Sequence, residues 1–151
     1  MEFNGFMQAA LAEARKAADR GEVPVGAVLV SPEGQIVARA GNRTRALSDP
    51  TAHAEILVIR EHCAELGSER LSEHDLYVTL EPCAMCATAI SAARIRRLYY
   101  GASDPKSGGV ELGARVFSHA QCHHAPEVYD GIGRSEAAML LKDFFEKRRQ
   151  V

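Results

Sequence analysis

Apolar residues recur at helical spacing in four stretches of the chain, which predicts four helices. The first begins after Asn4, a residue type that caps helices, and ends near Gly21. The others span residues 52–66, 83–93 and 136–149. The last has the clearest apolar face, formed by Ala137, Leu140, Leu141, Phe144 and Phe145.

Short apolar runs between these stretches predict β-strands. Residues 25–30 have the continuous apolar pattern of a strand buried on both faces. Residues 35–40 follow after a turn, so we expect the two strands to pair as a hairpin. Residues 76–80 and 95–100 flank the third predicted helix. Strand, crossover helix and strand is the pattern of a parallel pair.

The segment after the fourth predicted strand lacks a clear periodic pattern of apolar residues. Residues 101–113 are rich in Gly, Ser, Asp and Pro, which predicts a long loop, and long loops inside compact domains are often functional. We expect a short fifth strand at residues 115–117 and assign no element to residues 118–133. The whole pattern predicts one α/β domain over residues 1–151, with a mostly parallel or mixed sheet and helices on both faces.

Composition excludes several classes of protein. The net charge is −2, whereas a protein that binds nucleic acid over its whole surface is usually basic, so any such contact must come from local patches. The longest apolar run, residues 23–30, is too short to span a bilayer, and the N-terminus lacks the pattern of a secretory signal. The four cysteines do not form the pattern of a secreted disulfide scaffold. We therefore expect a cytoplasmic protein with reduced thiols.

Two of the cysteines stand where a predicted strand gives way to a helix. Cys83 and Cys86 fall in the first turn of that helix, and Pro82 suits a helix start because its φ is fixed and it has no N–H to leave unpaired. The partial positive charge of a helix N-terminus favours thiolate over thiol. Thiolates bind metals and also carry out redox chemistry, so this stretch by itself leaves both open.

A third candidate ligand opens the preceding helix. His53 stands at its start, and Glu55 follows two residues later. Because ligand sites in such sheets form at the carboxyl ends of strands, where helix N-termini converge, this imidazole can meet the two thiolates. Three protein ligands and a water make the open coordination of a catalytic zinc, and Glu55 could move protons beside it.

Together these residues carry a resemblance to a known family. The sequence HAE at residues 53–55, followed by PCAMC at residues 82–86, resembles the signature of the zinc-dependent cytidine and deoxycytidylate deaminase superfamily. Further blocks along nearly the whole chain are similar to the bacterial tRNA-specific adenosine deaminase family: residues 22–27, 41–43, 51–55, 77–83, 104–106 and 144–149. The resemblance implies a three-layer α/β/α cytidine-deaminase-like fold around a central mixed five-stranded sheet.

The resemblance also implies a role for each matching residue. Three of them, His53, Cys83 and Cys86, would hold one Zn²⁺ per subunit, with Glu55 as the catalytic proton shuttle. Zinc-bound hydroxide would attack the adenine ring carbon that bears the amino group, so that ammonia leaves and inosine remains at the wobble position of the tRNA anticodon.

Other matching residues would contact the substrate. Asn42 and the backbone at Ala54 would grip the flipped base, and Val25 would be a further substrate-binding residue. The residues implied to contact the anticodon loop are Asp104, Lys106, Phe145 and Arg148. The family works as a homodimer, so we expect a homodimer here, with neither a membrane nor DNA as a partner.

Four alternatives stay open at this point. A Cys-x-x-Cys pair at a strand–helix junction also suits a thioredoxin-like dithiol or a non-catalytic zinc protein, although the HAE motif and Pro82 favour the deaminase. The same fold and zinc site would serve a deaminase of free guanine, cytosine or a nucleoside. Residues 122–124 (Cys-His-His) fit no common zinc spacing, which favours a polar loop over a second metal site. An RNA-binding patch or merely solvated charge could be formed by Arg94, Arg96 and Arg97.

Overall fold

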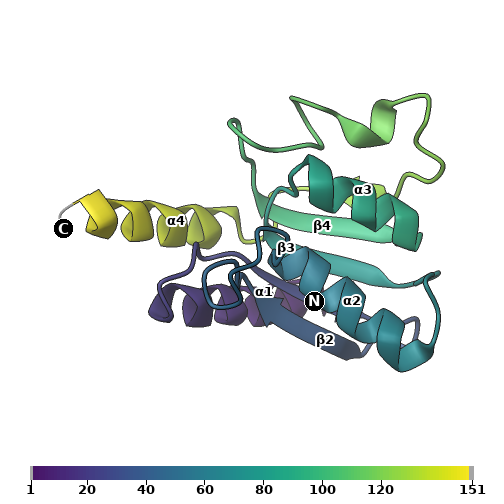
Figure 1. The fold of residues 1–151 in the computed structure, drawn as a ribbon, viewed down its shortest axis with the longest axis horizontal. Coiled ribbons are helices and arrows are strands. Elements are labelled where there is room, and N and C mark those ends of the chain that lie inside the picture. The colour runs from purple at the N-terminus through teal and green to yellow at the C-terminus, as the bar shows by residue number, and fades with distance from the viewer. Residues whose placement is uncertain (1, 150–151) are drawn as a thin grey trace.

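The computed structural model describes residues 2–149 (Figure 1). Its elements follow in the order α1 (Glu2–Asp19), β1 (Gly26–Val30), β2 (Ile36–Gly41), α2 (Ala54–Leu66), β3 (Asp75–Leu80), α3 (Ala84–Ala93), β4 (Arg97–Ala102), the 3-10 helix η1 (Val116–Ser118), β5 (Glu127–Tyr129) and α4 (Arg134–Arg149). The four expected helices and the first four expected strands are all present. Because α1 already begins at Glu2, Asn4 lies inside the helix and not at its cap.

The strands form one mixed sheet in the order β2-β1-β3-β4-β5. β1 pairs antiparallel with β2, as the hairpin prediction requires, and also antiparallel with β3. β3 and β4 are parallel, and β5 adds parallel to β4. Strands β2, β3, β4 and β5 therefore all point the same way, so the segments that follow them lie at one edge of the sheet.

Helices cover both faces of this sheet, which confirms the three-layer α/β/α architecture. The side chains of β1 point alternately to the two faces of the sheet. Val28 and Val30 pack in the core that α1 and α4 cover, whereas Ala27 and Leu29 pack in the core that α2 and α3 cover. Figure 1 shows α4, in yellow, running out past the sheet beside α1. Among residues 2–149, no helix combines the length and apolar character that crossing a membrane requires.

One close approach fixes α1 against the sheet. A Cβ at Gly26 would overlap the carbonyl oxygen of Ala10 in α1, so only glycine lets the helix lie this near the start of β1. The turn after α1, which carries Glu22, lies beside the loop after β2, because Glu22 accepts backbone N–H bonds from Arg45 and Ala46.

The fifth strand lies at residues 127–129, so the expectation of a strand at residues 115–117 was wrong. Arg115 has a φ of 45°, in the left-handed region, and η1 follows it directly. β5 consists of three exposed residues that pair with β4, and the ring of Tyr129 stacks on that of Tyr99 with centroids 5.0 Å apart. A strand this short has too little alternation to be seen in sequence, because pairing with its neighbour defines it.

Candidate active site

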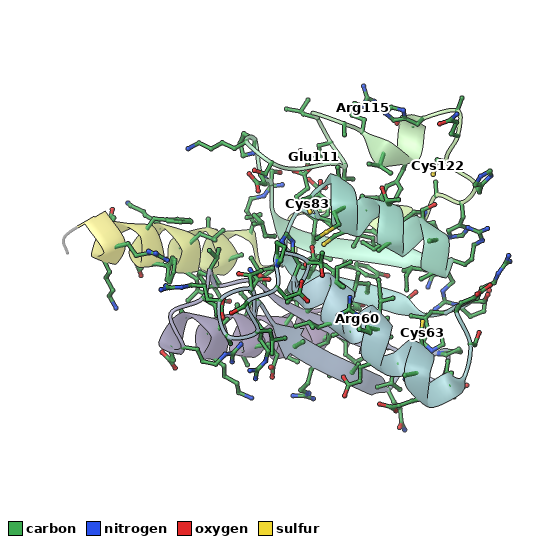
Figure 2. The ribbon with its side chains drawn as sticks, viewed as in Figure 1. Arg60, Cys63, Cys83, Glu111, Arg115 and Cys122 are labelled. Atoms are coloured by element: carbon green, nitrogen blue, oxygen red, sulfur yellow. The ribbon has the colours of Figure 1, made fainter. Side chains whose placement is uncertain are left out.

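The predicted metal ligands sit at the starts of two helices on the same face of the sheet. His53 is the N-cap residue of α2 and Cys83 the N-cap residue of α3, both with extended backbone, and Cys86 lies in the first turn of α3. α2 follows β2 and α3 follows β3, so both helix starts lie at the edge where these strands end. Figure 2 shows Cys83 at the start of α3, facing the space between the two helices.

These three side chains come close enough to share one metal ion. Nδ1 of His53 lies 3.7 Å from Sγ of Cys83 and 3.5 Å from Sγ of Cys86, and the ligand atoms all lie within 4.8 Å of one another. Two thiolates and an imidazole form a donor set that suits Zn²⁺. Nowhere else between residues 2 and 149 do three or more His, Cys, Asp or Glu side chains gather in this way.

The electrostatics of the trio favour a thiolate. Hydrogen bonds from Cys86 and His53 lower the pKa of Cys83 to about 4. The hydrogen bond to Cys83, together with burial, raises the pKa of Cys86, and the hydrogen bond to Cys83 also raises the pKa of His53. The geometry thus concentrates negative charge on sulfur beside two helix N-termini, as a cation site requires.

Glu55 lies in the first turn of α2 and is only 3 % exposed. Burial raises the pKa of its carboxyl to about 7, even though His53 acts in the opposite direction. A carboxyl with a pKa near neutrality is suited to taking up a proton and giving it back, which is the task of a general acid–base group.

The residues expected to grip a base adjoin this trio. The side-chain oxygen of Asn42 accepts a hydrogen bond from the backbone N–H of Ala54 at 3.0 Å, and its amide nitrogen donates to the carbonyl of Val23 at 3.2 Å. The backbone N–H of Asn42 donates to the carbonyl of Val25 at 3.1 Å. The structure therefore brings Val25, Asn42 and Ala54 together at the start of α2, next to His53.

Comparison with known proteins supports the same assignment. Residues 2–102 match the family model described as the cytidine and deoxycytidylate deaminase zinc-binding region. The chain is 64% identical over 144 residues to a tRNA-specific adenosine deaminase of Agrobacterium fabrum, covering 95% of this chain and 94% of the relative. This chain belongs to the tRNA-specific adenosine deaminase family. A second family member, from Bacillus subtilis, is 43% identical and covers 96% of this chain and 89% of its own.

Solved structures show how far the fold is shared. The first is a structure from studies of A-to-I editing by tRNA:A34 deaminases at the wobble position of transfer RNA. It has a TM-score of 0.89 and 65% sequence identity, and the match covers 91% of this chain and 99% of that chain. A guanine deaminase from Nitrosomonas europaea has a TM-score of 0.81 at 23% identity, covering 93% of this chain and 83% of its own. The second likeness concerns the fold alone, so a free-base deaminase is the weaker alternative for this family member.

The remaining predicted substrate residues come from two other segments. Asp104 and Lys106 are in the loop after β4, and Phe145 and Arg148 are near the end of α4. Arg148 lines a hollow of about 290 Å³ together with Gly21, Arg45 and Phe144. Its guanidinium carbon lies 5.3 Å from the centre of the Phe144 ring, whereas Phe145 is 43% exposed. Phe144 therefore shares this hollow with Arg148, and Arg45 is a candidate substrate contact that had no signal in the sequence.

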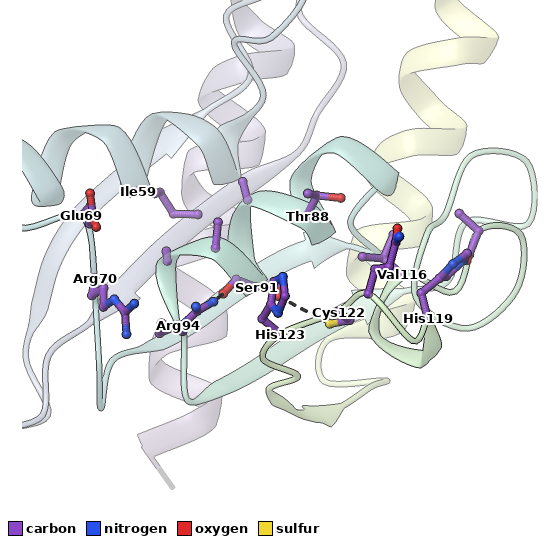
Figure 3. Close-up of a pocket in the computed structure, with 15 residues that line it drawn as sticks. Ile59, Glu69, Arg70, Thr88, Ser91, Arg94, Val116, His119, Cys122 and His123 are labelled. Carbon is purple, nitrogen blue, oxygen red and sulfur yellow. Dashed lines mark hydrogen bonds between the residues drawn. The ribbon is translucent and has the colours of Figure 1, made fainter.

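The segment around Cys122 borders a different hollow, of about 890 Å³, over α3 (Figure 3). The ring nitrogens Nε2 of His119 and His124 each lie 2.6 Å from a carbonyl oxygen, of Ala114 and Ile95 respectively. Among residues 2–149, three possible ligand atoms come within reach of one ion only at His53, Cys83 and Cys86, so this segment forms no such group. The thiol of Cys122 donates to the carbonyl of His124 at 3.1 Å. These bonds support the polar-loop interpretation of residues 122–124.

The two arginines just before β4, Arg94 and Arg96, and its first residue, Arg97, have partners within the protein. Arg96 makes two 3.0 Å hydrogen bonds to Asp75, and Arg97 lies 3.6 Å from Glu127. Arg94 donates to the carbonyl of Ser91 at 3.0 Å. Because each guanidinium already has an acceptor in the chain, an RNA-binding patch here is the weaker interpretation.

Two of the buried acids hold the backbone of a loop, and nothing in the sequence indicated either role. Glu22 is 1% exposed and accepts backbone N–H bonds from Arg45 at 3.1 Å and Ala46 at 2.8 Å, in the loop between Asn42 and α2. Burial raises the pKa of Glu22, but these hydrogen bonds outweigh it, so its pKa lies below the ordinary value. Glu81 is 4% exposed and bonds to the loop after β4. Hydrophobic patterning gives no signal for such residues, since it assigns acids to the surface.

Proposed function

We propose that this protein catalyses the zinc-dependent hydrolytic deamination of adenosine to inosine at the wobble position of a tRNA anticodon. The observation that carries the proposal is the meeting of His53, Cys83 and Cys86 beside the buried Glu55, in a chain that shares its sequence and fold with tRNA adenosine deaminases. A dithiol redox protein would need neither the imidazole nor the buried acid at this place.

We propose that the metal is Zn²⁺, one per subunit, held by His53, Cys83 and Cys86. The donor set and the spacing of the ligand atoms fit this ion. When bound, zinc supplies Lewis acidity that makes a water nucleophilic at neutral pH.

Glu55 has the proton-transfer role in this proposal. In the overall reaction a C–O bond forms at the adenine ring carbon, the C–N bond to the amino group breaks, and ammonia leaves. Glu55 takes the proton of the attacking water and later delivers it to the departing nitrogen. Its burial supports this role, because a buried carboxyl with a pKa near 7 exchanges protons readily in both directions.

We infer that the substrate lies across the edge of the sheet at which β2, β3, β4 and β5 end. Asn42, Ala54 and Val25 would hold the flipped base, while Asp104, Lys106, Phe145 and Arg148 would contact the surrounding anticodon loop. An anticodon loop suits this chain because its bases are unpaired, which spares the cost of opening a duplex. We further propose that residues 1–151 act as one deaminase domain, as a homodimer in the cytoplasm, with tRNA as the partner.

The test is a comparison of substrates. The zinc-loaded protein is incubated with an anticodon stem–loop containing adenosine at the wobble position, and separately with free adenosine, guanine and cytosine. We expect inosine in the stem–loop and no product from the free compounds. Deamination of the free compounds alone would replace the proposal with the free-base alternative. A Glu55→Gln variant, purified with its zinc, controls for contaminating deaminases.

A further inference from the structure

Glu81 is a buried acid that the reaction itself does not use. It lies between Leu80, the last residue of β3, and Pro82, next to the zinc-ligand turn, and is 4% exposed. Its carboxylate accepts three backbone N–H bonds from the loop after β4: Asp104 at 2.9 Å, Val110 at 3.0 Å and Glu111 at 2.9 Å. Three backbone donors on one buried carboxylate form a strong and specific anchor.

The loop is built around this carboxylate. A Cβ at Gly108 would overlap the Glu81 carboxylate group, so the loop closes over it only because residue 108 is glycine. Gly109 donates its N–H to the carbonyl of Pro82 at 2.8 Å, and Gly108 forms a β-bridge with Cys83. The loop is therefore attached both to Glu81 and to the backbone of a metal ligand.

The outer part of the same loop faces solvent. Asp104 is half-buried and Lys106 is exposed, and one oxygen of the Asp104 carboxylate accepts the backbone N–H groups of Lys106 and Ser107 at 3.1 Å each. Glu111, which Figure 2 labels, accepts hydrogen bonds from the hydroxyl groups of Ser103 and Tyr100. The loop thus has a fixed inner side, centred on Glu81, and an outer side free for a substrate.

We propose that Glu81 is a positioning residue for substrate binding: its buried carboxylate fixes the loop of residues 104–111 to the turn that carries Cys83. This inference rests on the proposed function, in which Asp104 and Lys106 meet the anticodon loop. Since the anchor and the metal ligand are two residues apart, the anchor sets the distance between the substrate-facing loop and the reacting centre.

The test replaces Glu81 by Gln. The amide keeps one acceptor oxygen, but its NH₂ group faces backbone N–H donors, so part of the loop loses its anchor. We expect the variant to keep its zinc, to raise the KM for the anticodon stem–loop about tenfold or more, and to change kcat much less, as loss of binding interactions predicts. A Gly108→Ala variant, which pushes the loop off the carboxylate without altering it, should shift KM in the same direction. Glu73→Gln, at an exposed acid before β3, is the matched control and should change neither value.

A second readout keeps the inference separate from the proposed function. Amide hydrogen exchange should be faster at residues 104–111 in both variants than in the parent protein, whether or not the stem–loop is a substrate. Failure of the parent to deaminate the stem–loop would count against the function alone. Any of three results would overturn the positioning role. These are unchanged amide exchange in residues 104–111, a lower kcat with unaltered KM in both variants, and loss of zinc from the Gly108→Ala variant.

Discussion

Replacing Glu22 by Gln should destabilise the protein by about 1–3 kcal/mol, the usual cost of breaking a hydrogen bond to a buried charged group. The carboxylate is 1% exposed and accepts the backbone N–H groups of Ala46 at 2.8 Å and Arg45 at 3.1 Å, with the Thr44 hydroxyl further off at 3.4 Å. Gln keeps a single acceptor oxygen, so one backbone donor loses its partner. For a chain of this length the Tm should fall by about 2–12 °C.

The effect should depend on pH in a definite direction. The folded-state pKa of Glu22 is lowered from its ordinary value of 4.5, so the carboxylate stabilises the fold above that value. This contribution is lost as the pH falls through the folded-state pKa. The Tm difference between parent and Glu22→Gln should therefore be largest near neutral pH and should shrink in acid.

The assay is thermal unfolding followed by circular dichroism, with the zinc content of parent and variant matched. Glu33→Gln, at an exposed acid in the turn between β1 and β2, is the control and should leave the Tm within about 1 °C of the parent, as for most surface substitutions. Equal Tm values for parent and Glu22→Gln, or a Tm difference that does not narrow in acid, would show that the buried carboxylate does not stabilise the fold through these bonds.

Three further predictions address the site and the core. Glu55→Gln should keep its zinc, measured by metal analysis, yet lose about 100-fold to 10,000-fold in turnover of the stem–loop; near-parental turnover would remove Glu55 as the proton shuttle. Cys86→Ala should lose zinc and melt at a lower temperature, because ligation energy is partly folding energy, and full zinc retention would mean that Cys86 is not a ligand. Leu98→Ala, at a fully buried position in β4, should lower the free energy of unfolding by about 2–5 kcal/mol, measured by chemical denaturation, without altering zinc content. An unchanged free energy of unfolding would contradict the packing described.

The meeting of the three proposed metal ligands could be predicted from the sequence because their positions follow from local rules. Cys83 and Cys86 stand at a strand-to-helix junction and His53 at another, and in a sheet of this kind such junctions meet at one edge. The HAE and PCAMC motifs then carried the resemblance, which the comparisons confirm at the level of the family.

Features that depend on tertiary contacts were not accessible. The acids Glu22 and Glu81 are buried by loops that fold over them, and neither loop has a periodic pattern. β5 exists because β4 offers its edge, and its three exposed residues carry no alternation. Helical spacing assigned both Phe144 and Phe145 to the apolar face of α4, but only the structure shows that Phe144 lines a hollow with Arg148.

The decisive measurement for the proposed activity is zinc-dependent turnover of one RNA. An anticodon stem–loop with adenosine at the wobble position is incubated with the purified protein, with the protein stripped by a chelator, and with stripped protein to which Zn²⁺ is returned. We expect inosine in the first and third reactions and none in the second. Inosine formation at the same rate by the stripped protein, or no inosine in any of the three, would contradict the proposed activity.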